Sequence, residues 1–425
     1  MIKINIILYA IIIICFYDIC DAKFENYMTI ENIKFSVNGS NVKNFKIGKI
    51  RFSNNKLMFC NFPRTNNSLT ATFTKINLDK KDVYEPYPNS TLNEFNGSCD
   101  RLISVISFEF DEKDNLYILD EGRYKNRKNC PPKLIIYNNE KEIQRYNLEN
   151  TIIDNQDIQL EDILIDRINN YIYISYHDTN NISGIFLMHN DTNKKVKRLL
   201  YNNERLKEES GYTLHIKGAD PLPKEISQIK SMGLSCDGEA FFFSFISSKM
   251  IYSILTKEIY MDYKNDTNKN ETNKNDIYVD KIYEAYKNDA TSTIIYSNMG
   301  NLFLTGLEKN KIYSYDLIDN DLSRFDYKGL RELNTTGENI SFPVKMTFYN
   351  GKIFLLTNLL NSSKYTIYSE IINEKSYIYG CAGLKYQFNL SFYIMLGIFI
   401  LILLFVLTFV IVGNIQDKYI NKKNN

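Results

Sequence analysis

One short pattern recurs along the chain and restricts the folds open to it. A polar turn of Asn, Asp or Gly precedes an apolar run with an aromatic residue near its centre. The copies lie at 54–59, 114–118, 169–174, 237–242, 299–304 and 350–355. Asn-Gly and Asp-Gly turns, as at 350–351 and 237–238, favour tight hairpins because both tolerate a positive φ. The sequence therefore predicts six β-hairpins at intervals of about 50–70 residues.

Further apolar runs flank the hairpins, for example at 158–165, 229–235 and 311–317. Several antiparallel strands in each repeat of about 40–60 residues are typical of a β-propeller blade. The 32 Tyr and 26 Phe residues also favour strands. We therefore predict an all-β, six-bladed propeller over residues 23–390. The alternative is a β-sandwich of six unrelated hairpins, which would need no periodicity.

The N-terminal segment 1–22 has the pattern of a secretory signal peptide. Lys3 precedes an apolar run from Ile4 to Phe16, and the small residue Ala22 supplies a cleavage position. An uncleaved membrane anchor is the alternative. Either interpretation sends the following residues into the secretory pathway.

A second apolar segment lies near the C-terminus. Residues 392–412 carry no charge, and about 20 apolar residues suffice to cross a bilayer as a helix. We predict a transmembrane helix at 391–413 and a short cytoplasmic tail at 414–425, where lysines agree with the cytoplasmic side. The protein would be a single-pass membrane protein with a lumenal or extracellular propeller. Its location would be the cell surface, or the endoplasmic reticulum if the final KKNN is a retrieval signal rather than a chance occurrence.

Composition narrows the possible partners. The formal net charge of +1 argues against a nucleic-acid binder, which would carry a basic face or tail. About a dozen Asn-X-Ser/Thr sequons, such as Asn38, Asn89 and Asn96, predict a glycoprotein, although the abundance of Asn produces many by chance. Residues 262–276 are low in complexity and almost free of apolar residues, so we expect a disordered insertion there.

The cysteines fit an oxidising compartment. The stretch 99–137 predicts three antiparallel strands with Cys99 and Cys130 at its ends, where a disulfide could tie the first strand to the third. After removal of the signal peptide the chain keeps these two and Cys60, Cys236 and Cys381. Five is an odd number, so one thiol is free or pairs between molecules. We expect Cys236 to be a buried free thiol, and the pairing of Cys60 and Cys381 stays open.

The same stretches resemble the major royal jelly protein / Yellow family. The similarity begins at 47–78 with Pro63-Arg64 and Ala71-Thr72, continues through YEPYPN at 84–89, and is strongest across DNLYILDEGR and CPPKLIIY within 99–137. Looser agreement follows at 226–254, 292–317 and 340–358. The resemblance covers roughly residues 45–360 and implies a six-bladed propeller, in agreement with the repeat count.

The resemblance also implies a ligand site. Members that bind biogenic amines in the central channel use a Thr before the fifth hairpin and an Asn and a Phe within it. The matching positions here are Thr291, Ser292 and Thr293, then Asn301 and Phe303. Hydroxyl and carboxamide groups could hold an amine, and a phenyl ring could stack on an aromatic ligand. Alternatively, Asn301 is a turn residue and Phe303 belongs to the core.

Other signals of chemistry are sparse. Asp120 and Glu121 could act as an acid–base pair, or could form a loop ion pair with Arg123. We expect no metal site and no cofactor, because zinc, calcium and phosphate-binding motifs are missing from the sequence. We therefore expect a binding module for a small molecule or a protein partner. The alternatives are an enzyme of the dopachrome-isomerase or lactonase-like type, and a structural or assembly protein.

Overall fold

The computed structural model describes residues 24–382 with gaps and, beyond them, only Ile398, Phe405, Thr408 and Val412. The longer gaps are 65–68, 149–157, 191–195, 204–211, 217–227, 265–275, 318–326, 334–340 and 359–362. The chain divides into two compact units, Met1–Gly380 and Cys381–Asn425. The first unit contains all the strands that the structure describes.

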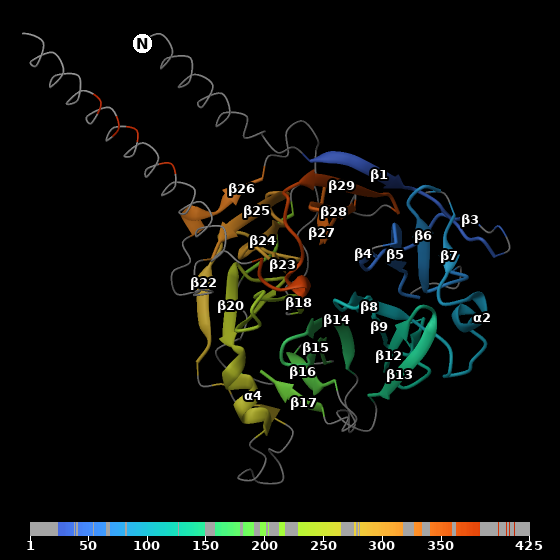
Figure 1. Ribbon diagram of the computed structural model, residues 1–425. Coiled ribbons are helices and arrows are strands. Elements are labelled where there is room, and N and C mark those ends of the chain that lie inside the picture. The colour runs from blue at the N-terminus through green and yellow to red at the C-terminus, as the bar shows by residue number, and fades with distance from the viewer. Residues whose placement is uncertain are drawn as a thin grey trace, which may run out of the picture. The chain divides into compact units, whose positions relative to one another are not determined.

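Six sheets follow one another around a central axis, and we call the space along this axis the channel (Figure 1). The sheets are antiparallel, except that β17 pairs parallel with β21 in blade 3. Blade 1 contains β4 (Ile50–Phe52), β5 (Leu57–Asn61), β6 (Phe73–Asn77) and β7 (Glu85–Pro86), and blade 2 contains β8 (Val105–Phe110), β9 (Leu116–Asp120), β12 (Lys133–Asn138) and β13 (Lys141–Asn147). Blade 3 contains β14 (Gln159–Asp166), β15 (Tyr171–His177), β16 (Ser183–His189), β17 (Val196–Leu199) and β21 (Asp276–Ile277), and blade 4 contains β18 (Ile229–Leu234), β19 (Ala240–Phe245), β20 (Met250–Leu255) and β22 (Tyr283–Tyr286). Blade 5 contains β23 (Ile294–Tyr296), β24 (Asn301–Gly306), β25 (Lys311–Asp316) and β26 (Arg331–Glu332), and blade 6 contains β27 (Pro343–Tyr349), β28 (Lys352–Asn358), β29 (Tyr365–Ile371) and β1 (Glu25–Ile30).

This arrangement confirms the predicted six-bladed propeller. Each recurring turn joins the first strand of a blade, which lines the channel, to the second. Positive φ angles at Asp114, Gly238 and Asn350 explain the turn residues. We call the side of the propeller that carries these six turns the hairpin face. The opposite side, where the first strands begin, is the mouth face.

Strand β1 closes the propeller in a way that the sequence did not predict. It pairs antiparallel with β29, so that residues 25–30 form the outer strand of the last blade. The two ends of the propeller are thereby joined by backbone hydrogen bonds. Such closure covers the edge that β29 would otherwise expose.

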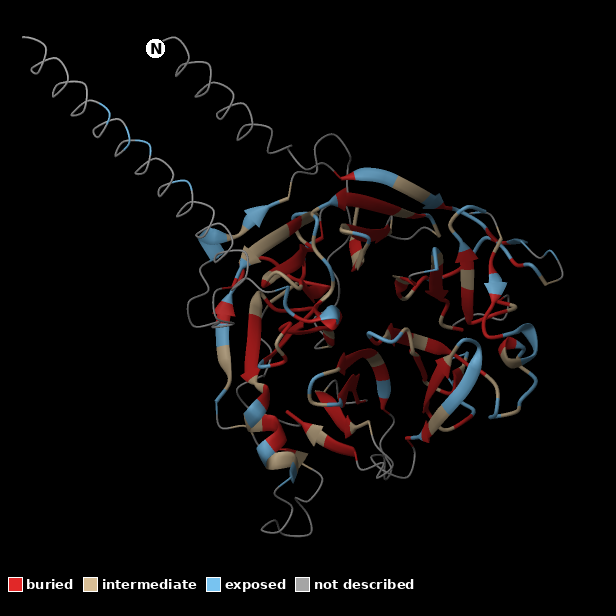
Figure 2. Cartoon of the chain, viewed as in Figure 1, coloured by how far each residue is buried: buried red, intermediate tan, exposed pale blue. Residues whose placement is uncertain are grey.

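The core lies between neighbouring blades, and buried residues concentrate on the inner strands (Figure 2). Aromatic side chains bridge the blades. Tyr173 of blade 3 stacks on Phe241 of blade 4 with 4.6 Å between the ring centroids. Phe242 of blade 4 stacks on Tyr296 of blade 5 with 5.6 Å between the ring centroids. Because these flat side chains fill the wedge between two sheets, the high Tyr and Phe content has a structural use.

Several predicted segments lie wholly or partly outside the described residues. These include 1–22 and, apart from four positions, 391–413. Among the described residues, no helix is long and apolar enough to cross a membrane. The expected insertion 262–276 begins inside α4 (Thr256–Lys264) and ends in β21, so its edges are ordered elements.

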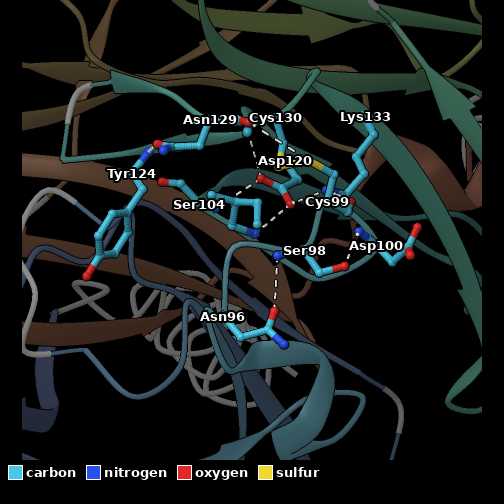
Figure 3. The surroundings of a disulfide bond; sticks show 12 residues. Asn96, Ser98, Cys99, Asp100, Ser104, Asp120, Tyr124, Asn129, Cys130 and Lys133 are labelled. Atoms are coloured by element: carbon cyan, nitrogen blue, oxygen red, sulfur yellow. Dashed lines mark hydrogen bonds and ion pairs between the residues drawn. A yellow bond between two sulfur atoms is a disulfide. The ribbon is translucent and has the colours of Figure 1, made fainter.

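The predicted Cys99–Cys130 disulfide is present, with a Cα–Cα distance of 5.3 Å (Figure 3). It ties the loop before blade 2 to the residues preceding β12. The expected free thiol at Cys236 is wrong, because Cys236 and Cys381 are both disulfide-bonded. The free cysteine among the described residues is Cys60, buried in β5, where burial raises its pKa well above the ordinary value. Spacing along the chain does not reveal which cysteines converge in a propeller, because blades bring distant residues together.

Removing the disulfide by the double substitution Cys99→Ser and Cys130→Ser is expected to lower the free energy of unfolding by about 3–4 kcal/mol, because the bridge closes a loop of 31 residues in the unfolded chain. Thermal unfolding followed by circular dichroism would measure the loss. Under a strong reductant the wild type and the double variant should unfold at the same temperature. A persistent difference would mean that the serines act by another route.

Candidate functional site

The first strands of four blades change register near the mouth face. Their pairing with the second strand shifts around Ile106, Glu161, Lys230 and Val344, as it does where a β-bulge inserts one residue. Bulges redirect side chains and are frequent beside functional sites. Two of these four positions carry charged side chains, Glu161 and Lys230, and they contact each other.

Deeper in the channel lies a set of paired charges that we call the ionic layer. Its members come from blades 1, 2, 3 and 6, and are Lys49, Arg51, Glu109, Asp162 and Lys345. The Lys49 ammonium lies 3.0 Å from Asp162 and 3.2 Å from Glu109. Arg51 donates two hydrogen bonds to Glu109, at 2.8 and 2.7 Å. Lys345 lies 2.7 Å from Asp162 and also donates to the Lys230 carbonyl at 2.9 Å.

The ionic layer holds three cations and two carboxylates. Burial opposes ionisation of Asp162, but Lys345 and Lys49 hold its pKa well below the ordinary value. Burial likewise opposes ionisation of Glu109, and Arg51 and Lys49 lower its pKa. Burial lowers the pKa of Lys49 despite these partners, as expected for the cation in excess. The ionic layer therefore links blades 1, 2, 3 and 6 through buried ion pairs and carries one positive charge more than its carboxylates neutralise.

Nearer the mouth face is a second group, the mouth cluster, made of Glu161, His177, Lys230 and Gln228. Glu161 pairs with Lys230 and lies 3.2 Å from Nδ1 of His177. The other ring nitrogen of His177 lies 3.2 Å from the Gln228 amide nitrogen. Burial opposes ionisation of Glu161, yet Lys230 and His177 lower its pKa to about 2. Side-chain exposures of 28% for Lys230 and 15% for Glu161 show that solvent reaches this cluster.

The predicted acidic loop adjoins the mouth cluster, and its two carboxylates, Asp120 and Glu121, have different surroundings. Asp120 is fully buried and accepts hydrogen bonds from the backbone nitrogens of Ile103, Ser104 and Gly122, and it lies 3.1 Å from Lys133 (Figure 3). Glu121 pairs with Arg123 at 3.2 Å. Burial raises the pKa of Glu121 to about 7, with Arg123 opposing and Glu161 adding to the rise. Asp120 thus organises the loop, while Glu121 is the group whose protonation is finely balanced.

The channel end at the hairpin face is covered by residues 372–380, which we call the strap. Backbone groups of Asn298 and Lys375 hydrogen-bond at 2.8 Å, and the Tyr377 hydroxyl donates to the Ile165 carbonyl at 3.0 Å. Beneath it lies a cavity of about 60 Å³. Its lining includes Arg51, Glu109, Met232, Tyr296, Phe348 and Tyr377. A pocket for a drug-sized molecule measures about 300–1,000 Å³, so this space suits a few waters at most.

The positions implied by the family resemblance lie together in blade 5, but most of their polar groups have partners. Ser292 donates to the Pro343 carbonyl at 2.6 Å, and Thr293 donates to the Val344 carbonyl at 3.1 Å. Thr291 is buried beside them. The Asn301 amide donates to Glu374 at 2.8 Å, and Phe303 packs edge-on against Phe348. A ligand role for these residues stays a prediction, since the contacts that the structure gives them join blade 5 to blade 6 and to the strap.

Sequence reasoning missed the ionic layer and the mouth cluster. Their charged residues lie next to or inside apolar runs, for example Lys49 before β4 and Glu161-Asp162 within β14. A charged residue at the start of an apolar strand that lines the channel was the sequence signal that could have indicated these two clusters. Among the described residues, no group of three His, Cys, Asp or Glu is placed to hold a metal ion. The channel carboxylates Glu109, Glu161 and Asp162 each contact cations of the protein itself.

Glu370 is a second carboxyl with a displaced pKa. It lies in β29, is 2% exposed, and neither of its side-chain oxygens has a hydrogen-bond partner. Burial raises its pKa to about 7. The folded state therefore binds a proton more tightly than the unfolded chain between about pH 4.5 and 7.

Stability is accordingly expected to rise as the pH falls from 8 to 5.5, with Glu370 and Glu121 each contributing about 1–2 kcal/mol. Glu370→Gln should remove about half of this pH dependence and stabilise the protein at pH 8. Urea unfolding at several pH values would measure it. The matched control is Glu94→Gln, an exposed position, which should leave the slope unchanged. A wild-type slope retained by Glu370→Gln would contradict the assignment.

Comparisons with known proteins give remote structural similarities and one family match. Solved structures similar to this chain include a luciferin-regenerating enzyme, at 9% identity and a TM-score of 0.44, covering 78% of this chain and 92% of that one. Another is regucalcin, a calcium-binding protein from Agrobacterium tumefaciens, at 9% identity and a TM-score of 0.46, covering 78% and 91%. A search of curated proteins gives no match. The profile of the major royal jelly protein family matches residues 103–386, two thirds of the sequence. This match confirms the resemblance found in the sequence, and the chain belongs to the major royal jelly protein family.

Proposed function

We propose that the protein is a membrane-anchored binding module of the secretory pathway that takes its ligand at the mouth face of the channel. The observation that supports this most directly is the position of the mouth cluster. The Lys230 side chain is 28% exposed, whereas those of Lys49 and Glu109 in the ionic layer are 3% and 9% exposed, and the strap covers the far end. A ligand entering from the mouth face would meet Glu161, His177 and Lys230 first.

The chemistry of the mouth cluster favours a small ligand that both donates and accepts hydrogen bonds. Glu161 stays ionised and can accept from an ammonium or hydroxyl group, while Lys230 can donate to a carboxylate or carbonyl. Because Lys230 competes for Glu161, a simple amine would have to displace a cation of the protein. Zwitterionic or hydroxylated molecules match both groups at once.

Two alternatives stay open. An acid–base enzyme of the isomerase or lactonase-like type is favoured by one observation: the pKa of Glu121 is about 7 and that of Glu161 about 2, and such a separation suits proton transfer. Failure of the purified protein to convert dopachrome or lactones would exclude that candidate. A protein partner on the mouth face is the other alternative, and crosslinking on intact cells would search for it.

The test is a thermal-shift screen of the purified protein with amines, amino acids, carboxylates and aromatic metabolites. A compound that binds only the folded state raises its unfolding temperature in proportion to its concentration over Kd. We expect a hit whose effect disappears in Glu161→Gln. If no compound shifts the unfolding temperature, the small-ligand form of the proposal is wrong.

A further inference from the structure

The chain leaves the propeller on the hairpin face. The strap ends at Gly380, which packs so closely on Arg167 that an added Cβ would lie 2.4 Å from the guanidinium. Arg167 belongs to the turn between β14 and β15, and therefore to the hairpin face. Only residues 383–391 separate Ala382 from the apolar segment 392–412. An extended chain covers about 3.5 Å per residue, so these nine residues span roughly 30 Å at most.

Exposed apolar side chains are distributed unevenly over the propeller. Among its described residues seven large apolar side chains are exposed: Ile143, Ile168, Met261, Tyr286, Tyr327, Ile371 and Tyr379. Tyr286 and Tyr327 pack on each other, and Tyr286 lies at the mouth-face end of β22, opposite Met250. The other five lie toward the hairpin face. Tyr379 belongs to the strap, Ile168 to the turn after β14, and Ile371 ends β29 beside the turn at Gly351.

We propose that the hairpin face lies against the lipid bilayer, with Ile168, Ile371 and Tyr379 in the interfacial layer. This inference rests on the membrane anchoring put forward above. Tyrosine is favoured at the bilayer interface because its ring is apolar and its hydroxyl stays hydrated. Ile168 and Ile371, 47% and 59% exposed, would lose contact with water there. The mouth cluster would then face away from the membrane, open to ligands in the lumen or outside the cell.

The test uses full-length protein reconstituted in phosphatidylcholine vesicles that contain a headgroup-labelled nitroxide lipid. A thiol-reactive fluorophore is placed at Ile168→Cys or Ile371→Cys, and at Arg127→Cys as the matched control. Arg127 is an exposed residue of β11 (Arg127–Lys128), in the loop between β9 and β12 on the mouth face. The protein is used without the predicted signal peptide 1–22, which contains Cys15 and Cys20. Labelling is then selective because Cys60 is buried and the other four cysteines of the described chain are disulfide-bonded.

In protein that floats with the vesicles, we expect the nitroxide to remove most of the fluorescence at positions 168 and 371 and little at 127. Equal quenching at all three positions, or greater quenching at 127, would overturn the proposed orientation while the anchoring stands. Protein that stays in the soluble fraction would overturn both. Two labels on different blades keep the result decisive if one variant fails to fold.

Discussion

Replacing Asp162 by asparagine is expected to lower the free energy of unfolding by about 3–5 kcal/mol, whereas replacing Lys49 by methionine should change it by less than about 1.5 kcal/mol. The difference follows from the charge count of the ionic layer. Without Asp162, the layer keeps three cations and one carboxylate, Glu109, and Lys345 loses its carboxylate partner. Without Lys49, Arg51 still pairs with Glu109, and Lys345 still pairs with Asp162. Asp162→Asn leaves a buried cation without its counter-charge, which costs far more free energy than Lys49→Met, which removes the one cation in excess.

Urea unfolding of the purified full-length protein measures both changes. Lys49→Met is the matched control, because it alters the same buried layer at a residue that is 3% exposed. The double variant, Asp162→Asn with Lys49→Met, should recover part of the loss, since it removes one of the two positive charges that are then in excess. If Lys49→Met lowered the free energy of unfolding more than Asp162→Asn does, the excess of positive charge would not determine how the ionic layer contributes to stability.

Asp120→Asn is expected to destabilise the protein by about 3–5 kcal/mol, although the side chain keeps its size. The carboxylate accepts from three backbone nitrogens and pairs with Lys133, which is 2% exposed. An asparagine would turn an NH₂ group toward one of these donors and leave the Lys133 ammonium without its counter-charge. The loop that carries the Cys99–Cys130 disulfide and Glu121 would lose its anchor.

Thermal unfolding and the rate of proteolysis within residues 99–137 would measure the effect. Asp100→Asn is the matched control, because Asp100 lies in the same loop and is exposed. It should leave both quantities unchanged. Comparable losses in the two variants would show that the loop responds to its total charge rather than to the hydrogen bonds of Asp120.

The sequence was sufficient to predict the architecture, because each blade repeats a turn that only a few residue types can form. Turns such as Asp237-Gly238 and Asn350-Gly351 need a positive φ, and that local requirement is visible without any tertiary information. The Cys99–Cys130 disulfide was also predictable from local information, because both cysteines lie at the ends of one short predicted three-stranded sheet.

The site depends on contacts between blades, and these were not predictable. Lys49 meets an aspartate more than a hundred positions later in the sequence, and Lys345 reaches the same carboxylate from blade 6. The register shifts that bring Glu161 and Lys230 together do not alter the apolar pattern of β14 and β18. Likewise, nothing local indicates that β1 pairs with β29, because the two strands are far apart in the sequence although they are neighbours in blade 6.

The most direct measurement for the proposed function is the affinity of a compound found in the thermal-shift screen, determined by titration calorimetry for the wild type, Glu161→Gln and Glu94→Gln. Glu94→Gln tests a glutamate with a 74% exposed side chain, away from the mouth cluster. We predict that Glu161→Gln weakens binding at least about tenfold, which corresponds to about 1.4 kcal/mol, and that Glu94→Gln leaves Kd unchanged. Equal affinity in all three proteins would contradict a ligand site at the mouth of the channel.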